Sequence, residues 1–195
     1  MLPSVRHRIL IASGALICFA LSGCGVDAPP RIAPDLSKLA PSEYGKPIFF
    51  GSGGEGDRLK LTGWAGAEPP FTWTDGIAAS LAIRLATTQE PVQLQFKMCG
   101  MNVPKRLPSQ RVDLYINSEK VVRWEVSDEA VFTVPVPEKF LSKPDPLLVI
   151  DFYMPNASSP AALGVGGDSR RLGIRLSELT VLKGPPPAPS VEPAR

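Results

Sequence analysis

Residues 110–126 read QRVDLYINSEKVVRWEV, and this stretch decides the fold class. Apolar and polar residues alternate on both sides of Asn117-Ser118, with the two-residue period of a β-strand that buries one face. A pair such as Asn-Ser between two alternating runs is typical of a tight β-hairpin turn. The stretch therefore predicts an antiparallel hairpin whose strands run over residues 112–116 and 121–126.

The same alternation continues outward in both directions along the chain. It recurs at residues 58–61, 81–85, 92–98, 132–136 and 174–181, and residues 147–154 are almost continuously apolar, as in a strand covered on both faces. Turn-forming residues separate the runs, and helical periodicity is scarce. About eight or nine such strands are typical of two antiparallel sheets packed together. We therefore expect an all-β domain over residues 48–183, an antiparallel β-sandwich of the jelly-roll, galactose-binding-like type.

Residues 1–24, MLPSVRHRILIASGALICFALSGC, have the composition of an export signal. Positive charge at residues 6–8 precedes an apolar run of 13 residues, Ile9–Leu21. A membrane-spanning helix needs about 20 apolar residues, so this run is too short to span and has the length of a signal-peptide core. The sequence predicts a signal peptide over residues 1–23.

The run ends in Leu21-Ser22-Gly23-Cys24, which resembles the bacterial lipobox. That resemblance implies a diacylglyceryl group on the Cys24 thiol, cleavage before Cys24, and usually acylation of the new amino group. Two or more acyl chains anchor a protein stably, whereas one holds only marginally. Gly25 occupies the position where aspartate favours inner-membrane retention in enterobacterial lipoproteins, so it favours the outer membrane. We expect a lipoprotein of the bacterial cell envelope, at the outer membrane or periplasmic face rather than in the cytoplasm.

Both ends of the predicted domain are rich in proline. Residues 24–47 contain five prolines and no sustained periodicity, which predicts a semi-extended tether. Residues 184–195, GPPPAPSVEPAR, have nothing to bury, so we expect a disordered tail.

Most of the side chains that enzymes use are missing after residue 23. The only histidine is His7, inside the predicted signal peptide, and Cys99 is the one cysteine left once Cys24 carries lipid. A Ser-His-Asp triad, a Cys-His pair and a histidine-based zinc site are therefore excluded. No P-loop or dinucleotide fingerprint occurs. We expect a protein that is not an enzyme and that holds no cofactor.

The charge balance also limits the partners. Two of the 21 basic residues, Arg6 and Arg8, precede residue 24, so the remainder has 19 basic and 19 acidic residues. This balance does not suit a nucleic-acid partner. A structural Ca²⁺ ion would take oxygen ligands such as Asp57, Asp75 and Asp168, but their spacing is not that of a calcium-binding loop, so the sequence does not favour one.

Residues 63–76, GWAGAEPPFTWTDG, differ from plain strand sequence. Sugar rings bind by laying their apolar faces on indoles while charged side chains take the hydroxyls. The segment therefore predicts a ligand surface made by Trp64, Trp73 and Asp75. In the alternative interpretation, the two indoles fill the open end of the sandwich.

Residues 155–174 form a long loop that leads into the last strand, and loops of this length are commonly functional or locally structural. Asp168 and Arg170 could bind polar groups of a ligand beside the first segment. Alternatively, they form a salt bridge that only pins the loop.

The chain also carries a set of spaced motifs: Gly63-Trp64, Trp73-Thr74-Asp75-Gly76, Val112-x-Leu114-x-Ile116-Asn117, Ser159-Pro160-x-x-Leu163-Gly164 and Asp168-x-Arg170-Arg171-Leu172-Gly173-Ile174. In this order they resemble a β-sandwich module of bacterial envelope proteins. Such modules occur beside membrane-bound glycosyltransferases and phosphoglycerol-transferase-like proteins. The resemblance implies a glycan-linked setting and no particular reaction.

Three functions remain open on the sequence. The first is a non-catalytic domain that binds a glycan or assists polysaccharide handling at the cell surface. The second is an interaction module for an envelope protein, which a large apolar patch would favour. The third and weakest is a glycosidase with paired carboxylates, which two facing carboxyls in a cleft would favour.

Overall fold

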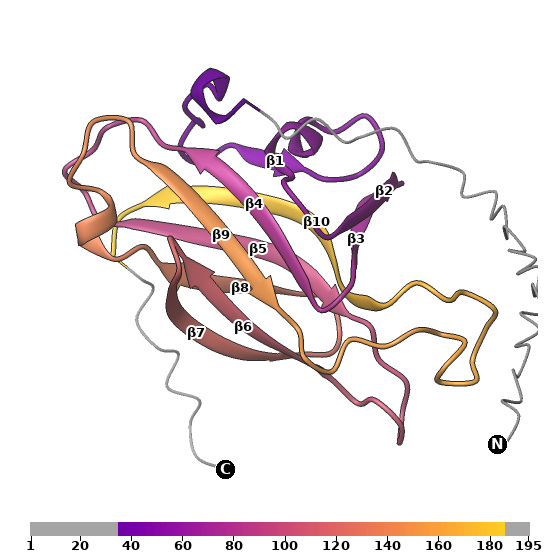
Figure 1. Ribbon diagram of the computed structural model, residues 1–195. Coiled ribbons are helices and arrows are strands. Elements are labelled where there is room, and N and C mark those ends of the chain that lie inside the picture. Colours follow the sequence, from indigo (N-terminus) through magenta and orange to yellow (C-terminus); the bar gives the residue numbers. More distant parts are fainter. Residues whose placement is uncertain (1–34, 186–195) are drawn as a thin grey trace, which may run out of the picture. The chain divides into compact units, whose positions relative to one another are not determined.

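The computed structural model describes residues 35–185 (Figure 1). The predicted signal peptide, Cys24 and the segment from residue 186 onward lie outside the described residues, so cleavage, lipidation and the nature of that tail stay predictions. Within residues 35–185, no helix is long and apolar enough to cross a membrane.

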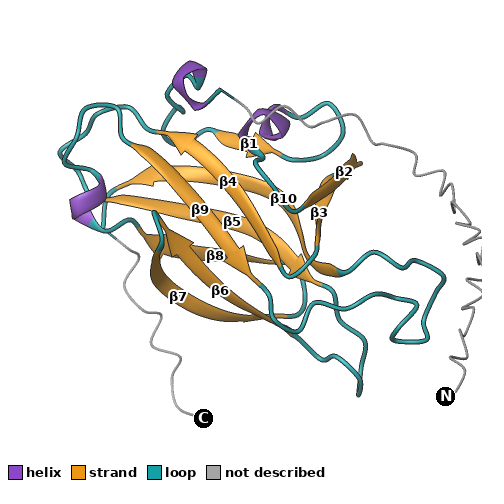
Figure 2. Ribbon diagram, in the orientation of Figure 1, coloured by secondary structure: helices purple, strands orange, loops and turns teal. Residues whose placement is uncertain are grey.

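The described chain folds into ten β-strands with three short 3₁₀ helices at its loops (Figure 2). The strands are β1 (Pro47–Phe49), β2 (Trp64–Glu68), β3 (Phe71–Asp75), β4 (Ala78–Arg84), β5 (Val92–Gly100), β6 (Gln110–Ile116), β7 (Glu119–Val126), β8 (Ala130–Pro135), β9 (Leu147–Tyr153) and β10 (Leu172–Lys183). The 3₁₀ helices are η1 (Leu36–Lys38), η2 (Glu55–Leu59) and η3 (Glu138–Phe140).

The strands form two antiparallel sheets that face each other (Figure 1). One sheet has the order β2-β3-β10-β5-β8, with β1 also paired to β10, and the other has the order β4-β9-β6-β7. The crossovers between the sheets make this a β-sandwich of jelly-roll type, so the predicted fold class is confirmed. The predicted hairpin is β6–β7, and both turn residues, Asn117 and Ser118, have positive φ, as in a type I′ turn.

The core lies between the sheets and is built by the inward positions of the central strands. Leu94, Phe96 and Met98 of β5 are fully buried, as are Leu148, Ile150 and Phe152 of β9. Burying a side chain of this size stabilises the fold by roughly 1.5–3 kcal/mol. The other face of β9 is only half-buried, so the prediction that this strand is covered on both faces is wrong.

The prediction of a strand at residues 58–61 is also wrong. Residues 55–59 form η2, and Lys60 alone makes a bridge, to Leu81 of β4. Leu59 is buried and Leu61 packs against the core, so both leucines reach the interior without a regular strand. Leu59 and Leu61 match the two-residue period of a strand because a bent segment can also direct alternate side chains towards the core.

The last part of the predicted tether lies against the sandwich. Leu39 is buried, the Tyr44 hydroxyl donates to the Ala86 carbonyl at 2.6 Å, and Ser42 forms a parallel bridge with Leu85. Arg84 fastens the same segment by donating to the carbonyl oxygens of residues 36 and 39. The packed region therefore includes residues ahead of the predicted boundary at residue 48.

Candidate functional site

Trp64 belongs to the core rather than to a ligand surface, contrary to the sequence prediction. Its side chain is 3% exposed, its ring stacks on Phe50 with 6.2 Å between ring centroids, and it packs edge to face with Phe152 with 6.0 Å between centroids. The indole N–H donates to the Ser80 carbonyl at 2.8 Å. The preceding Gly63 has φ +74°, and a Cβ there would lie 2.0 Å from the Ala78 carbonyl oxygen, so glycine permits the close turn that precedes the buried indole.

Strand β3 reverses the usual burial pattern. Its polar residues Thr72 and Thr74 point inward and are fully buried, whereas its aromatic residues Phe71 and Trp73 point outward and are only half-buried. Each threonine hydroxyl is satisfied inside. The Thr72 hydroxyl donates to the Phe50 carbonyl, and the Thr74 hydroxyl oxygen accepts from the backbone N–H of residues 173 and 174.

The two outward rings of β3 meet each other. Phe71 and Trp73 pack edge to face, with 5.9 Å between ring centroids and an interplanar angle of 78°. A shift of one residue in the register of β3 would have placed both rings in the core. Their outward position is therefore fixed by the register of β3 against β10. An aromatic pair at a sheet surface without full burial is the kind of feature that ligands and partners contact.

Arg175 of β10 completes this surface. It lies directly across from Trp73, and its guanidinium carbon is 4.8 Å from the Phe71 ring centroid. Glu129 lies 4.0 Å from one guanidinium nitrogen, and the buried Nε has no hydrogen-bond partner within the described residues. The cation is attracted by the face of the ring and holds it in place.

The loop before β10 brings charged groups to one end of the same strands. Arg170 binds Asp168 through two guanidinium nitrogens, Nε to Oδ2 at 3.0 Å and Nη2 to Oδ2 at 2.7 Å, and reaches Glu68 of β2 at 3.5 Å. The Arg170 side chain holds the pKa of the Asp168 carboxyl below its ordinary value by hydrogen bonding. This pair pins the loop to the β2–β3 hairpin, which is the alternative that the sequence left open.

Asp75 is the last residue of β3 and is exposed, and it is paired with Leu172 of β10. The structure therefore places Trp73 and Asp75 on β3 beside β10, ties the Asp168–Arg170 pair to Glu68 of β2, and removes Trp64 from the set. Sequence reasoning did not identify Arg175. Its outward position follows from the alternation in the last strand, but its partner on β3 depends on long-range pairing.

Within residues 35–185, no three acidic, histidine or cysteine side chains come together as a metal site. Asp57 pairs with Lys60, and Asp168 is held by Arg170.

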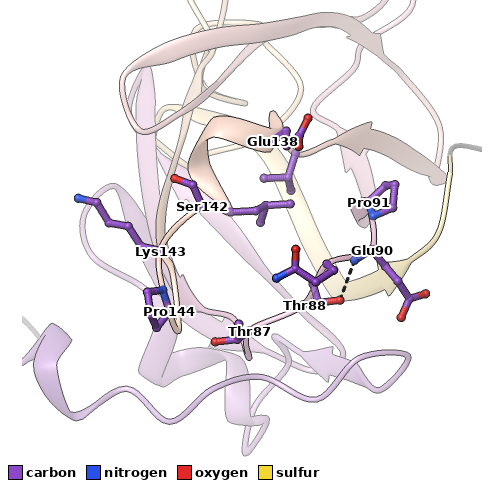
Figure 3. Close-up of a pocket in the computed structure, with 11 residues that line it drawn as sticks. Thr87, Thr88, Glu90, Pro91, Glu138, Ser142, Lys143 and Pro144 are labelled. Atoms are coloured by element: carbon purple, nitrogen blue, oxygen red, sulfur yellow. Dashed lines mark hydrogen bonds between the residues drawn. The ribbon is translucent and has the colours of Figure 1, made fainter.

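A separate pocket of about 640 Å³ lies between the β4–β5 and β8–β9 loops (Figure 3). It is lined by Thr87, Thr88, Gln89, Glu90, Pro91, Val136, Glu138, Leu141, Ser142, Lys143 and Pro144. Thr88 accepts a hydrogen bond from the backbone of Glu90, and the charged ends of Glu90 and Lys143 turn away from the pocket (Figure 3). None of the predicted site residues lines it.

No family model matches the sequence, and no curated protein matches it. Among solved structures, the chain is similar to the CBM36-1 domain of a multidomain xylanase from the hindgut metagenome of Trinervitermes trinervoides, with 13% identity, TM-score 0.43, and coverage of 72% of this chain and 98% of that one. It is also similar to a carbohydrate-binding module CBM36 in complex with calcium and xylotriose (9% identity, TM-score 0.41, 70% and 98% covered). A family 35 carbohydrate-binding module from Clostridium thermocellum gives 10% identity, TM-score 0.36, and 71% and 99% coverage.

Proposed function

We propose that this domain is a non-catalytic glycan-binding module whose ligand surface is formed by Phe71, Trp73 and Arg175. The reversed burial pattern of β3 carries the proposal, because the fold buries two threonines and leaves two aromatic rings at the surface. Apolar sugar faces pack on such rings, and neighbouring charged groups accept or donate to the hydroxyls. Asp75 and the Asp168–Arg170 pair border this surface.

Two features favour binding over hydrolysis. A general acid needs a raised pKa, whereas the pKa of Asp168 is lowered by Arg170. Glu68 and Asp168 both contact the same guanidinium, so each carboxylate is engaged in an ion pair. Glycosidase chemistry therefore receives no support from this pair.

The proposed cellular setting comes from the sequence. The lipobox at residues 21–24 supports a lipid anchor on Cys24, and the anchor would hold the module at the surface of a membrane in the bacterial envelope. A glycan-binding domain in that position would hold or guide cell-surface polysaccharide.

The test is binding of the purified protein to an immobilised panel of glycans, comparing wild type, Trp73→Ala and Tyr153→Ala. Tyr153 is a matched control, because it is a similarly accessible aromatic residue on the opposite sheet. Losing one aromatic contact of roughly 1–3 kcal/mol should weaken binding by about fivefold to 150-fold in Trp73→Ala. Tyr153→Ala should bind as wild type does. If wild type binds no glycan, or if both variants bind unchanged, the proposal is wrong and the protein-interaction hypothesis takes its place.

A further inference from the structure

We infer that the ligand is an uncharged linear oligosaccharide that crosses the strands of the larger sheet diagonally, from Trp73 of β3 to Val131 of β8. This inference rests on the proposed function and adds the kind of glycan and the direction in which it lies. It is carried by how outward side chains are aligned on β1, β3, β10, β5 and β8.

Two rows of outward side chains cross this sheet at right angles to the strands. In the first row, Trp73 is paired with Arg175, and Arg175 is paired with Cys99. The second row is four strands wide and contains Phe49, Glu178, Lys97 and Val131. Neighbouring strands lie about 4.8 Å apart, so the second row is about 14 Å long.

The ends of the second row are open to solvent and apolar. Phe49 is 53% exposed and Val131 is 57% exposed, which places them among the most exposed large apolar side chains of the described residues. Between them lie the charged groups of Glu178 and Lys97. A pocket would enclose one sugar at the end of a chain, whereas an open row of this length can contact several consecutive units.

The charges around the rows are balanced by ion pairs. Glu129 contacts Lys97 at 3.5 Å and Arg175 at 4.0 Å, and Arg170 contacts both Asp168 and Glu68. With Glu178 and the bordering Asp75, the surface has three cations and five carboxylates. A glycan with carboxylate or phosphate groups would therefore gain no net attraction, whereas neutral hydroxyls can bond to both signs of charge.

The experiment is calorimetric titration of the full-length protein, in a detergent without a sugar headgroup, with β-1,4-linked ladders of glucose, xylose and N-acetylglucosamine. A ladder of galacturonic acid is the charged comparison. In at least one neutral ladder, affinity should rise about tenfold from monosaccharide to trisaccharide, and the charged ladder should bind more weakly. Trp73→Ala should weaken binding at every length.

Val131→Ser tests the β8 end of the path that starts at Trp73. It should reduce trisaccharide affinity about fivefold more than monosaccharide affinity, because only a longer ligand reaches β8. Val165→Ser is the matched control, since Val165 is 53% exposed but lies on the loop between β9 and β10. Equal affinity at all lengths, no effect of Val131→Ser, or tighter binding of the charged ladder would overturn this inference while leaving glycan binding intact. Absence of binding to every ladder and to the glycan panel would overturn the proposed function itself.

Discussion

The two tryptophans of residues 63–76 should respond very differently to truncation. In Trp64→Ala, a ring with 3% exposure is removed from between Phe50 and Phe152. The loss should be about 3–5 kcal/mol, as for other buried aromatic residues cut back to alanine. The Ser80 carbonyl does not lose its only partner, because the backbone N–H of Leu61 also donates to it at 2.9 Å. No further penalty for an unsatisfied acceptor is therefore added.

Trp73→Ala is the matched comparison, because it removes the same side chain from the next strand. Trp73 is half-buried and makes one edge-to-face contact with Phe71, so its loss should cost about 1–2 kcal/mol. A small domain has about 5–15 kcal/mol of stability, so Trp64→Ala should be close to unfolding while Trp73→Ala stays folded.

Urea unfolding of a chain that begins at residue 25, followed by circular dichroism, measures both losses. The slope of unfolding free energy against urea should be the same for wild type and the variants, so that midpoints compare stabilities directly. Equal losses, or a larger loss for Trp73→Ala, would refute the assignment of Trp64 to the core and of Trp73 to the surface.

Three further outcomes follow from the same reasoning. Cys24→Ala should leave the protein unprocessed or soluble in cell fractionation, and a variant that still partitions with membranes after cleavage at the same site would contradict the lipobox. Asp113 is 4% exposed, and its carboxylate accepts a hydrogen bond from the Arg123 guanidinium, which lowers the pKa of Asp113. The stabilising effect of this carboxylate should therefore be present above about pH 3.9, the pKa of an aspartate in the unfolded chain, and should be lost as the pH falls below that pKa. Asp113→Asn should therefore be less stable by about 1 kcal/mol at pH 7, because its cationic partners are partly exposed, and melting curves should converge with wild type in acid. Deleting residues 186–195 should leave the melting temperature nearly unchanged, whereas deletion from Gly184 also removes hydrogen bonds to Pro91 and Gln93 and should lower it.

The sequence by itself determined the fold class and most of the strands. Alternation with a period of two is a local property, and it identified the runs that became β4 to β10, together with the β6–β7 turn. The absence of histidine after residue 23 and the balanced charge likewise needed no structure, and they directed the functional reasoning towards binding.

Strands β1, β2 and β3 were not predicted from the sequence because they are short and because β1 contains proline, β2 contains glycine and β3 contains threonine. The alternation of apolar residues in Phe71-Thr72-Trp73-Thr74 would even have placed the rings inside. The inward threonines are tolerated because their hydroxyls find backbone partners on Phe50 and on Gly173-Ile174, residues far away in the chain.

The same limit applies to the candidate site. Trp64 and Trp73 have the same chemistry and similar neighbours in the sequence, but one lies in the core and the other at the surface. Their difference comes from the register of β3 on β10 and of β2 on β3, and the β3–β10 register is a pairing between segments about 100 residues apart. Arg175 joins the site for the same reason. Composition and period are local and can be read from the chain, whereas the choice of which face of β3 meets solvent was decided only by tertiary pairing.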